Sequence, residues 1–348
     1  MTDQEYLALA ADQARQGAGQ TWTNPLVGAV LVKDGRILAR GYHHRFGQDH
    51  AEVNTLKQLN DVRQARGATM YVTLEPCSHY GKTPPCARKL VAVGIRRVVI
   101  GQRDPNPLVS GKGIAILRAA GIDVTVLATT TDLNPAYNFF YHHHRPLVTL
   151  KMAISADGKL NAATGTRTRL TGAEANHDSQ RFRATQQAIL VGERTLTIDQ
   201  PALTVRETAV AVPPRRVVVV NSADQIDRHN RLFRTSEPVW LLSRQPSHRS
   251  WPANVTVVAG RRWTPAQIVR YLAQQGLQSL LVEGGSHLHA QFVAAGLVDR
   301  LITYVAPVVL GGQALPAVQG AASQALPLTL TQVQSLGTDV RLTFRRRV

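Results

Sequence analysis

Apolar and polar residues alternate along the first part of the chain with the periods of helices and strands in turn. Apolar side chains recur at helical spacing over residues 4–16, and the apolar runs 27–33 and 36–42 are separated by Asp34-Gly35. An Asp-Gly pair between two such runs is typical of a β-hairpin. The pattern also predicts helices and strands over 51–59, 69–74, 86–93 and 97–101. Strands alternating with helices predict a sheet covered by helices.

The alternation starts again, with different contents, after a break at residues 138–146. This segment holds three adjacent histidines and Pro146. Consecutive side chains point in different directions, so we expect a polar linker here and no metal site. Beyond it, the pattern predicts strands and helices over 147–154, 216–220, 239–242, 267–275, 279–282, 288–295 and 301–309. We therefore predict two unrelated α/β domains, 1–144 and 145–348.

The chain carries a large excess of positive charge, with 40 Lys and Arg residues against 23 Asp and Glu and a net charge of +17. Such a balance is compatible with nucleic-acid binding, with phosphorylated small substrates, or with a proteome that is basic as a whole. The arginines are scattered, mostly in pairs, and aromatic residues make up only 5% of the chain, which leaves few stacking surfaces for single-stranded nucleic acid. We therefore expect phosphate sites for small molecules and no nucleic-acid partner.

Two further features concern the cellular compartment. The sequence holds no run of about 18 uncharged apolar residues, so it predicts no membrane span. Residues 1–5 are acidic, unlike the start of a secretory signal, and the chain has only 2 cysteines. We expect a cytoplasmic protein with no membrane partner, and we expect it to form a homo-oligomer.

The strongest chemical signal is a spaced set of one histidine and two cysteines. His50 is followed two residues later by Glu52, and Cys77 and Cys86 each follow a proline. Three protein ligands and a fourth position open to water are typical of catalytic zinc. His-x-Glu followed by Pro-Cys and a second cysteine is the signature of zinc-dependent base deaminases. We predict one zinc ion per chain, bound by His50, Cys77 and Cys86.

The chemistry explains why these residue types occur together. Zinc lowers the pKa of a bound water to about 7, which makes hydroxide available to attack an amino-bearing ring carbon. Glu52 is placed to move protons to the leaving nitrogen. In the alternative interpretation, His50 only starts a helix and the cysteines are small buried apolar residues. Both cysteines of the chain belong to the pattern, which favours zinc.

A longer series of motifs runs through both halves of the chain and matches the pattern of one known family. In the first half the matching segments are Asn24-Pro25-x-Val27-Gly28, Gly41-Tyr42-His43, His50-Ala51-Glu52, Thr73-Leu74-Glu75-Pro76-Cys77-Ser78-His79, Gly81-Lys82-Thr83-Pro84-Pro85-Cys86 and Asp104-Pro105-Asn106-Pro107. In the second half they are Leu150-Lys151-x-Ala153, Ser155-x-Asp157-Gly158-Lys159, Pro201-x-Leu203-Thr204-x-Arg206 and Val282-Glu283-Gly284-Gly285. This series resembles the bifunctional deaminase–reductases of riboflavin biosynthesis. The resemblance covers nearly the whole chain, in the domain order of that family.

The resemblance implies a cytidine-deaminase-like α/β/α domain followed by a dihydrofolate-reductase-like α/β domain. It implies that the first hydrolyses the 2-amino group of a phosphoribosylated pyrimidine and that the second reduces the ribosyl group to ribityl with NADPH. Zinc would then be bound by His50, Cys77 and Cys86, with Glu52 as the proton shuttle. The implied substrate contacts in this half are Asn24, His43, Lys82, Asp104 and Asn106. Loop and turn roles for these five stay open, especially beside prolines.

The second half lacks the Gly-x-Gly-x-x-Gly fingerprint of many dinucleotide-binding folds. The resemblance instead places NADPH beside glycines that follow a predicted strand, where the backbone and a helix start can approach a pyrophosphate. The implied cofactor contacts are Ala153, Arg169, Thr195, Asp199, Ser222, Gly285, Ser286, His287, Leu288, His289, Ala290 and Gln291. The implied substrate contacts are Lys151, Arg167, Arg183, Leu203, Arg206 and Glu283. For Lys151 and Asp157, a buried or turn role is an equal alternative.

The chain departs from the family pattern at a few positions of the second half. Arg169 stands where an aromatic residue is usual, Arg167 where a small hydroxyl residue is common, Gln200 where an aspartate is usual, and Val308 where a lysine is frequent. Two other functions remain as hypotheses at this point. One is a nucleic-acid base deaminase, which leaves the second half unexplained, and the other is a deaminase whose second domain has become a phosphate- or RNA-binding module.

Overall fold

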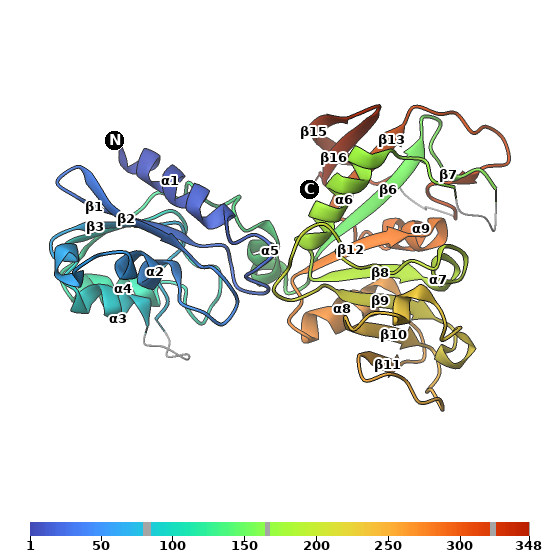
Figure 1. Cartoon of the computed structure of the whole chain (residues 1–348), viewed down its shortest axis with the longest axis horizontal. Helices are drawn as coiled ribbons and strands as arrows, with labels where there is room; N and C mark the ends of the chain where they lie inside the picture. Colours follow the sequence, from blue (N-terminus) through green and yellow to red (C-terminus); the bar gives the residue numbers. More distant parts are fainter. Residues whose placement is uncertain (79–84, 164–167, 321–324, 348) are drawn as a thin grey trace. The chain divides into compact units, whose positions relative to one another are not determined.

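The computed structural model describes residues 1–78, 85–163, 168–320 and 325–347. The chain separates into two compact units, Met1–His144 and Arg145–Val348 (Figure 1). Each unit has its own sheet and its own buried apolar clusters. Within the described ranges, no helix is long and apolar enough to cross a membrane.

In the first unit, the described residues form a five-stranded sheet in the order β2-β1-β3-β4-β5. The strands are β1 (Gly28–Lys33), β2 (Arg36–Tyr42), β3 (Thr69–Val72), β4 (Arg97–Ile100) and β5 (Asp123–Val126). β1 pairs antiparallel with β2 and β3, whereas β3, β4 and β5 run parallel. The predicted hairpin at Asp34-Gly35 is confirmed, since Lys33 pairs with Arg36.

Helices cover both faces of this sheet. They are α1 (Asp3–Arg15), α2 (Ala51–Lys57), α3 (Cys86–Ala92), α4 (Lys112–Ala119) and α5 (Pro135–His143), with a short 3-10 turn, η1, at Val62–Ala65. Apolar residues of α2, α3 and α4 pack into one cluster with one sheet face. Apolar residues of α1 pack against the other face, with Val30, Tyr71 and Val99. The result is a three-layer α/β/α unit, because alternate residues of each strand point to opposite faces.

The prediction of a polar linker at 138–146 is wrong. Residues up to His143 belong to helix α5, which begins at Pro135, and His144 ends it in a left-handed conformation with φ 54°. The ring of Phe139 stacks on His143 at 4.2 Å, one helical turn away. Proline is well suited to a first helical position. The run of three polar histidines concealed this helix.

In the second unit, the described residues form a nine-stranded sheet in the order β11-β10-β9-β8-β12-β6-β13-β16-β15. The strands are β6 (Leu147–Ser155), β8 (Ala188–Gly192), β9 (Arg215–Val220), β10 (Val239–Ser243), β11 (Val255–Ala259), β12 (Ser279–Gly284), β13 (Arg300–Ala306), β15 (Leu328–Leu336) and β16 (Asp339–Arg346). Neighbours from β11 to β13 pair in parallel, and β16 and β15 add an antiparallel edge.

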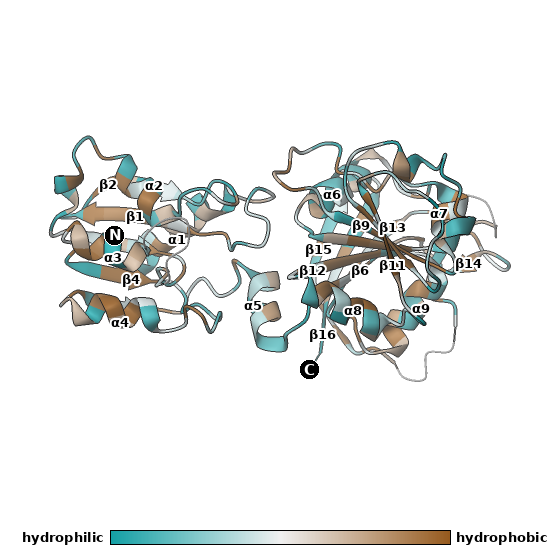
Figure 2. Cartoon of the chain, turned by 90° about the horizontal axis from the view of Figure 1, so that it is seen from below, coloured by the Kyte–Doolittle hydropathy of each residue, from teal (hydrophilic) through white to brown (hydrophobic). Residues whose placement is uncertain are grey.

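The remaining elements of this unit lie around the sheet. They are α6 (Ala173–Ala184), α7 (Glu193–Asp199), α8 (Pro265–Gln274), α9 (Ser286–Ala294), the 3-10 turns η2 (Ala223–Gln225) and η3 (Arg231–Phe233), and a small sheet of β7 (Lys159–Asn161) with β14 (Leu315–Pro316). Brown strands and largely teal α6 in Figure 2 show the apolar interior and the polar helix surface. The carboxyl ends of the parallel strands all lie at the same end of the sheet, and α/β proteins bind ligands there.

Candidate active sites

The three predicted metal ligands come together in the first unit. His50 immediately precedes α2, Cys86 is the first residue of α3, and Cys77 follows β3. The Nδ1 atom of His50 lies 3.5 Å from Cys77 Sγ and 3.3 Å from Cys86 Sγ, and all three ligand atoms lie within 4.8 Å of one another. Tetrahedral zinc with bonds of about 2.3 Å to sulfur and about 2.0 Å to nitrogen separates these donors by about 3.5 Å. The donor set therefore fits zinc in both chemistry and spacing.

The electrostatics of this set favour a thiolate at Cys77. Hydrogen bonding from the Cys86 side chain, together with the neighbouring His50, lowers the pKa of Cys77 to about 4 although burial opposes this. The backbone N–H of Cys86 also donates to Cys77 Sγ at 3.2 Å. A thiolate is the form of cysteine that binds metal. The fold thus brings the three donors together, with His50 and Cys86 at helix starts and both cysteines directly after prolines.

Glu52 lies beside the donor set but is not part of it. It is in the first turn of α2, and its side chain is buried, with 3% of the residue exposed. Burial raises the pKa of its carboxyl to about 7. A carboxyl group with a pKa near neutrality can both accept and donate a proton. The local geometry fits a proton shuttle that does not bind metal.

Two of the predicted substrate contacts form a polar pair next to the donor set. His43 Nδ1 lies 2.9 Å from the carbonyl oxygen of Asp49, and its Nε2 lies 3.2 Å from Asn24 Nδ2. Burial lowers the pKa of His43. The neutral ring can donate from Nδ1 to Asp49 and accept from Asn24. The rings of His43 and His50 meet edge to face at 5.6 Å, which brings this pair to the metal ligands.

Two more of the predicted contacts of the first half, Asp104 and Asn106, lie in a loop after β4. Asp104 is buried, and its Oδ1 accepts from the Tyr137 hydroxyl at 2.9 Å and from the Asn106 backbone N–H at 2.8 Å. The Asn106 side chain accepts from the backbone N–H of Leu108 at 3.0 Å. The turn roles that the sequence left open are therefore present in the fold for both residues. Lys82 lies outside the described residues.

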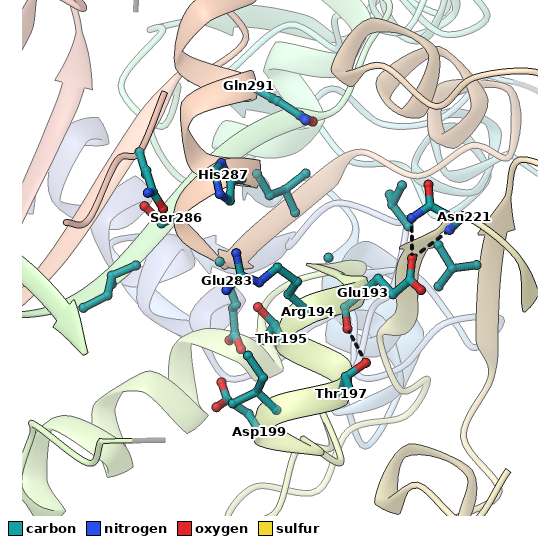
Figure 3. Close-up of a pocket in the computed structure, with 18 of the residues that line it drawn as sticks. Glu193, Arg194, Thr195, Thr197, Asp199, Asn221, Glu283, Ser286, His287 and Gln291 are labelled. Carbon is teal, nitrogen blue, oxygen red and sulfur yellow. Dashed lines mark hydrogen bonds between the residues drawn. The ribbon is translucent and has the colours of Figure 1, made fainter. Parts of the chain in front are cut away.

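The second unit contains a cavity of about 1080 Å³ at the carboxyl ends of β8, β9, β10 and β12. Seven of the predicted cofactor contacts line it, namely Thr195, Asp199, Gly285, Ser286, His287, Leu288 and Gln291. Figure 3 shows Ser286, His287 and Gln291 on α9 across from Thr195 and Asp199 on α7. A Cβ atom at Gly285 would lie 3.0 Å from Thr195 Oγ1, so glycine allows a close approach there.

The remaining predicted cofactor contacts lie outside the lining of this cavity. Ala153 is on β6, Ser222 precedes η2, Arg169 is exposed, and Ala290 is buried on α9. His289 is 1% exposed, and burial lowers its pKa to about 4, so the ring is neutral. Its Nδ1 lies 3.1 Å from the carbonyl oxygen of Ala317, whereas its Nε2 has no hydrogen-bond partner among the described residues. That buried acceptor fits a ligand able to donate a hydrogen bond.

The sequence prediction missed part of the cavity wall. The additional lining residues include Glu193, Arg194, Asn221, Arg244, Arg262 and Trp263. Glu193 accepts hydrogen bonds from the backbone and the side chain of Asn221 at 2.8 and 3.0 Å (Figure 3). A usable signal was present, because these residues follow the ends of β8, β9, β10 and β11. In a parallel sheet, residues that follow the carboxyl ends of neighbouring strands lie together at the same end of the sheet.

Three of the predicted substrate contacts of the second half form one charged cluster. Arg183 donates from Nε and Nη2 to the two carboxylate oxygens of Glu283 at 3.1 and 2.7 Å, and from Nη1 to the Thr204 carbonyl at 2.9 Å. Burial acts to raise the pKa of Glu283, but the positive charges of Arg183 and Lys151 outweigh it and lower that pKa. Glu283 also lines the cavity, so the cluster opens into it.

Two of the other substrate contacts of this half, Leu203 and Arg206, lie before and after Thr204 in the sequence. Leu203 is buried in the apolar core at φ 54°. The exposed Arg206 donates its backbone N–H to Gln180 Oε1 at 3.2 Å. The Lys151 ammonium lies 5.4 Å from the centre of the Tyr304 ring, and burial lowers its pKa. Arg167 lies outside the described residues.

Comparison with known proteins places this chain in a family. Residues 1–102 match the cytidine and deoxycytidylate deaminase zinc-binding region, and residues 146–342 match the RibD C-terminal domain. Riboflavin biosynthesis protein RibD of Bacillus amyloliquefaciens is 38% identical over 98% of this chain and 95% of its own length. The corresponding protein of Escherichia coli K12 is 37% identical over 98% of this chain and 99% of its own length. The chain belongs to the RibD family.

Solved structures agree with this assignment. Acinetobacter baumannii RibD (form 1) superposes with a TM-score of 0.91 at 33% identity, covering 99% of both chains. The diaminohydroxyphosphoribosylaminopyrimidine deaminase/5-amino-6-(5-phosphoribosylamino)uracil reductase of Thermotoga maritima superposes with a TM-score of 0.90 at 30% identity, also covering 99% of both chains. The predicted fold class, a cytidine-deaminase-like domain followed by the family's reductase domain, is confirmed.

The predicted enzyme class is confirmed as well. This RibD-family chain is a bifunctional deaminase and reductase of riboflavin biosynthesis, with zinc and NADPH as its cofactors. The similarity to RibD extends over both halves of the chain. The hypothesis of a nucleic-acid base deaminase does not explain the similarity in the second half. The membership also makes a degenerate second domain unnecessary as an explanation for residues 145–348.

Proposed function

We propose that the Met1–His144 unit deaminates 2,5-diamino-6-(5-phosphoribosylamino)pyrimidin-4(3H)-one and that the Arg145–Val348 unit reduces the ribosyl group of the product with NADPH. The final product would be 5-amino-6-(5-phosphoribitylamino)uracil. The observation that supports the first step best is the donor set of His50, Cys77 and Cys86 with the buried carboxyl of Glu52 beside it. The second step is supported by the large cavity whose wall contains Glu283 and the start of α9.

In the deamination, the zinc held by His50, Cys77 and Cys86 would supply a bound water with a pKa near 7. Glu52 would take a proton from the attacking water while the water oxygen bonds to the ring carbon that carries the 2-amino group and the π electrons of the adjacent ring C=N bond move to the ring nitrogen. Glu52 then delivers the proton to the amino nitrogen, the C–N bond breaks, and ammonia leaves. The burial of Glu52 suits both halves of this transfer, because it raises the pKa of the carboxyl to about 7, where the group can both accept and donate a proton. Asn24 and His43 are proposed to orient the pyrimidine.

In the reduction, the cavity at the carboxyl ends of β8, β9 and β12 is proposed to hold NADPH, with its pyrophosphate near the start of α9. The bound cofactor would supply a hydride to the ribosyl carbon that becomes the first carbon of the ribityl chain, while the bond from that carbon to the sugar ring oxygen breaks and that oxygen takes up a proton. Lys151 and Glu283 lie where they can orient the sugar hydroxyls, and Glu283 is held by Nε and Nη2 of Arg183. Arg206 is proposed to bind the substrate phosphate, since its side chain is exposed.

A coupled assay on the purified full-length protein tests this assignment. Ammonia release from the diaminopyrimidine should require zinc and proceed without NADPH. NADPH oxidation should require the deaminated pyrimidine and continue after the zinc has been removed. NADPH oxidation that stops when zinc is removed, or ammonia release from free cytidine but not from the diaminopyrimidine, would contradict it.

A fragment starting at Arg145 should fold and reduce the deaminated substrate without zinc. The unit has its own core, and its first residue is anchored internally, because Arg145 Nη1 and Nη2 donate to the Asp299 carboxylate at 2.7 Å each. Circular dichroism and an NADPH oxidation assay measure folding and activity. A matched fragment carrying Arg145→Met should be less stable than the first. A folded fragment that neither binds nor oxidises NADPH would refute the assignment of reduction to this unit.

Arg206→Met should raise the KM of the reductase for the phosphorylated pyrimidine roughly ten- to a hundredfold, because a charge-assisted hydrogen bond to phosphate contributes about 1.5–3 kcal/mol. Steady-state kinetics of NADPH oxidation at saturating NADPH measure the effect. Arg228→Met changes an exposed arginine outside the cavity lining and is the control. Equal KM values for the two variants would show that Arg206 does not bind the phosphate.

A further inference from the structure

Glu75 is a buried acidic residue to which no role in the reaction has been given. It lies after β3 and two residues before the metal ligand Cys77, and only 3% of it is exposed. In the described part of the chain, no lysine, arginine or histidine forms an ion pair with it. A buried carboxylate is costly unless hydrogen bonds satisfy its oxygens. Its partners therefore indicate what it does.

Four backbone N–H groups donate to the two carboxylate oxygens of Glu75. Oε2 accepts from Asp104 at 3.3 Å and from Gly111 at 3.0 Å. Oε1 accepts from Gly113 at 3.1 Å and from Ile114 at 3.2 Å. The first set joins Glu75 to the loop of Asp104, and the second caps the first turn of α4. One side chain thus holds two segments that lie far from it in the sequence.

The backbone around Glu75 is packed too closely for this arrangement to shift freely. A Cβ atom at Gly113 would lie only 2.0 Å from the carbonyl oxygen of Pro76, the residue between Glu75 and Cys77. The backbone N–H of Glu75 also donates to the Gln102 carbonyl at 2.9 Å. The start of α4 and the loop after β4 are therefore pressed against the peptide that leads to Cys77. Glycine at 113 is what permits this contact.

The same loop carries Asp104 and Asn106, two of the substrate contacts that the family resemblance implies. Asp104, whose N–H is held by Glu75, accepts from the Tyr137 hydroxyl and from the Asn106 N–H through Oδ1. On the other side of Glu75, Cys77 accepts hydrogen bonds from α3, through its sulfur from the N–H of Cys86 and through its carbonyl from the N–H of Ala87. Glu75 is the side chain that joins these two groups of contacts. It fixes the distance between a metal ligand and the Asp104 loop.

We propose that Glu75 is a positioning residue of the deaminase, which holds Cys77 in the geometry that binds zinc and holds the Asp104 loop in the geometry that binds the pyrimidine. The proposal rests on the proposed function of the first unit for its substrate part only. The charge is essential to this role, since four N–H donors converge on two oxygens and an amide would present its own N–H groups to one pair of them.

Glu75→Gln in the zinc-loaded full-length protein tests the proposal. Groups that support metal ligands typically contribute about 10- to 100-fold to metal affinity or activity. We expect zinc transfer to a chromogenic chelator to become at least about tenfold faster, and kcat/KM of deamination to fall by about 10- to 100-fold, with part of the loss in KM. NADPH oxidation by the same protein should be unchanged, which shows that the second unit is intact, and an unchanged far-ultraviolet circular dichroism spectrum shows that the first unit is folded. Glu5→Gln, in the capping box of α1, is the matched control for loss of a helix-capping carboxylate.

Gly113→Ala is the second variant, and it leaves the carboxylate intact. The added Cβ must push the start of α4 away from Pro76, so we expect the same two changes in the same direction. Zinc transfer and KM at parental values in either folded variant, with only the melting temperature lowered, would overturn the proposal and leave a purely structural role. If Glu75→Gln does not fold, Gly113→Ala and its zinc transfer rate decide. Failure of the parent protein to deaminate the diaminopyrimidine would refute the proposed function, whereas the zinc transfer rates would still test the positioning of Cys77.

Discussion

Cys77→Ala is expected to remove zinc and deamination together while NADPH-dependent reduction continues at the parental rate. Cys77 supplies one of three donor atoms lying within 4.8 Å of one another, and its thiol has a pKa of about 4 because hydrogen bonds from the Cys86 side chain and His50 favour the thiolate. Two remaining donors leave zinc without the three-ligand set typical of catalytic sites. Metal analysis should show about one zinc per parent chain and none in the variant.

The control for this experiment is the parent protein stripped of zinc with a chelator. It should lose deamination and regain it when zinc is added, whereas the Cys77→Ala protein should not respond to zinc. The reductase rate, measured on the same samples, monitors the integrity of the second unit, and circular dichroism of the whole chain monitors the folding of both units. Deamination by a variant that contains no zinc would refute the assigned metal chemistry. Zinc bound to the variant in equal amounts would refute the assigned ligand set.

Glu52→Gln should keep zinc and lose deamination by about 10²- to 10⁴-fold, the usual contribution of a general acid–base group. The side chain is buried beside the metal ligands without belonging to the donor set, so the isosteric amide preserves the packing but cannot carry the proton. Metal analysis and single-turnover ammonia release separate the two effects. Asp61→Asn, which removes an exposed carboxylate that caps η1, is the control. A Glu52→Gln protein that turns over at the parental rate would show that another group moves the proton.

The sequence determined those features that depend on residues close together along the chain. The Asp34-Gly35 turn sets the β1–β2 hairpin. It joins two apolar runs, and both residues tolerate the positive φ angles that a two-residue hairpin turn requires. The residues around His50, Cys77 and Cys86 read as a zinc set from their types and spacing, and the distances between their donor atoms fit that metal. Helix α5 was mistaken for a linker because its adjacent histidines show no apolar periodicity. The last turn of the helix is instead packed through the stacked rings of Phe139 and His143.

Only the tertiary structure decided which distant residues meet. Glu283 and Arg183, 100 residues apart, form a bidentate pair inside the second unit, and no local pattern records that pairing. Arg244 and Arg262 face the cavity because their strands are parallel neighbours. In the sequence, nothing distinguishes Glu75 from other residues before Pro-Cys. In the folded chain, four backbone N–H groups from distant segments donate to its carboxylate. Local motifs identify which chemical groups a site contains. The free-energy cost of burying those groups depends on their partners, and the sheet decides which segments lie close enough to supply them.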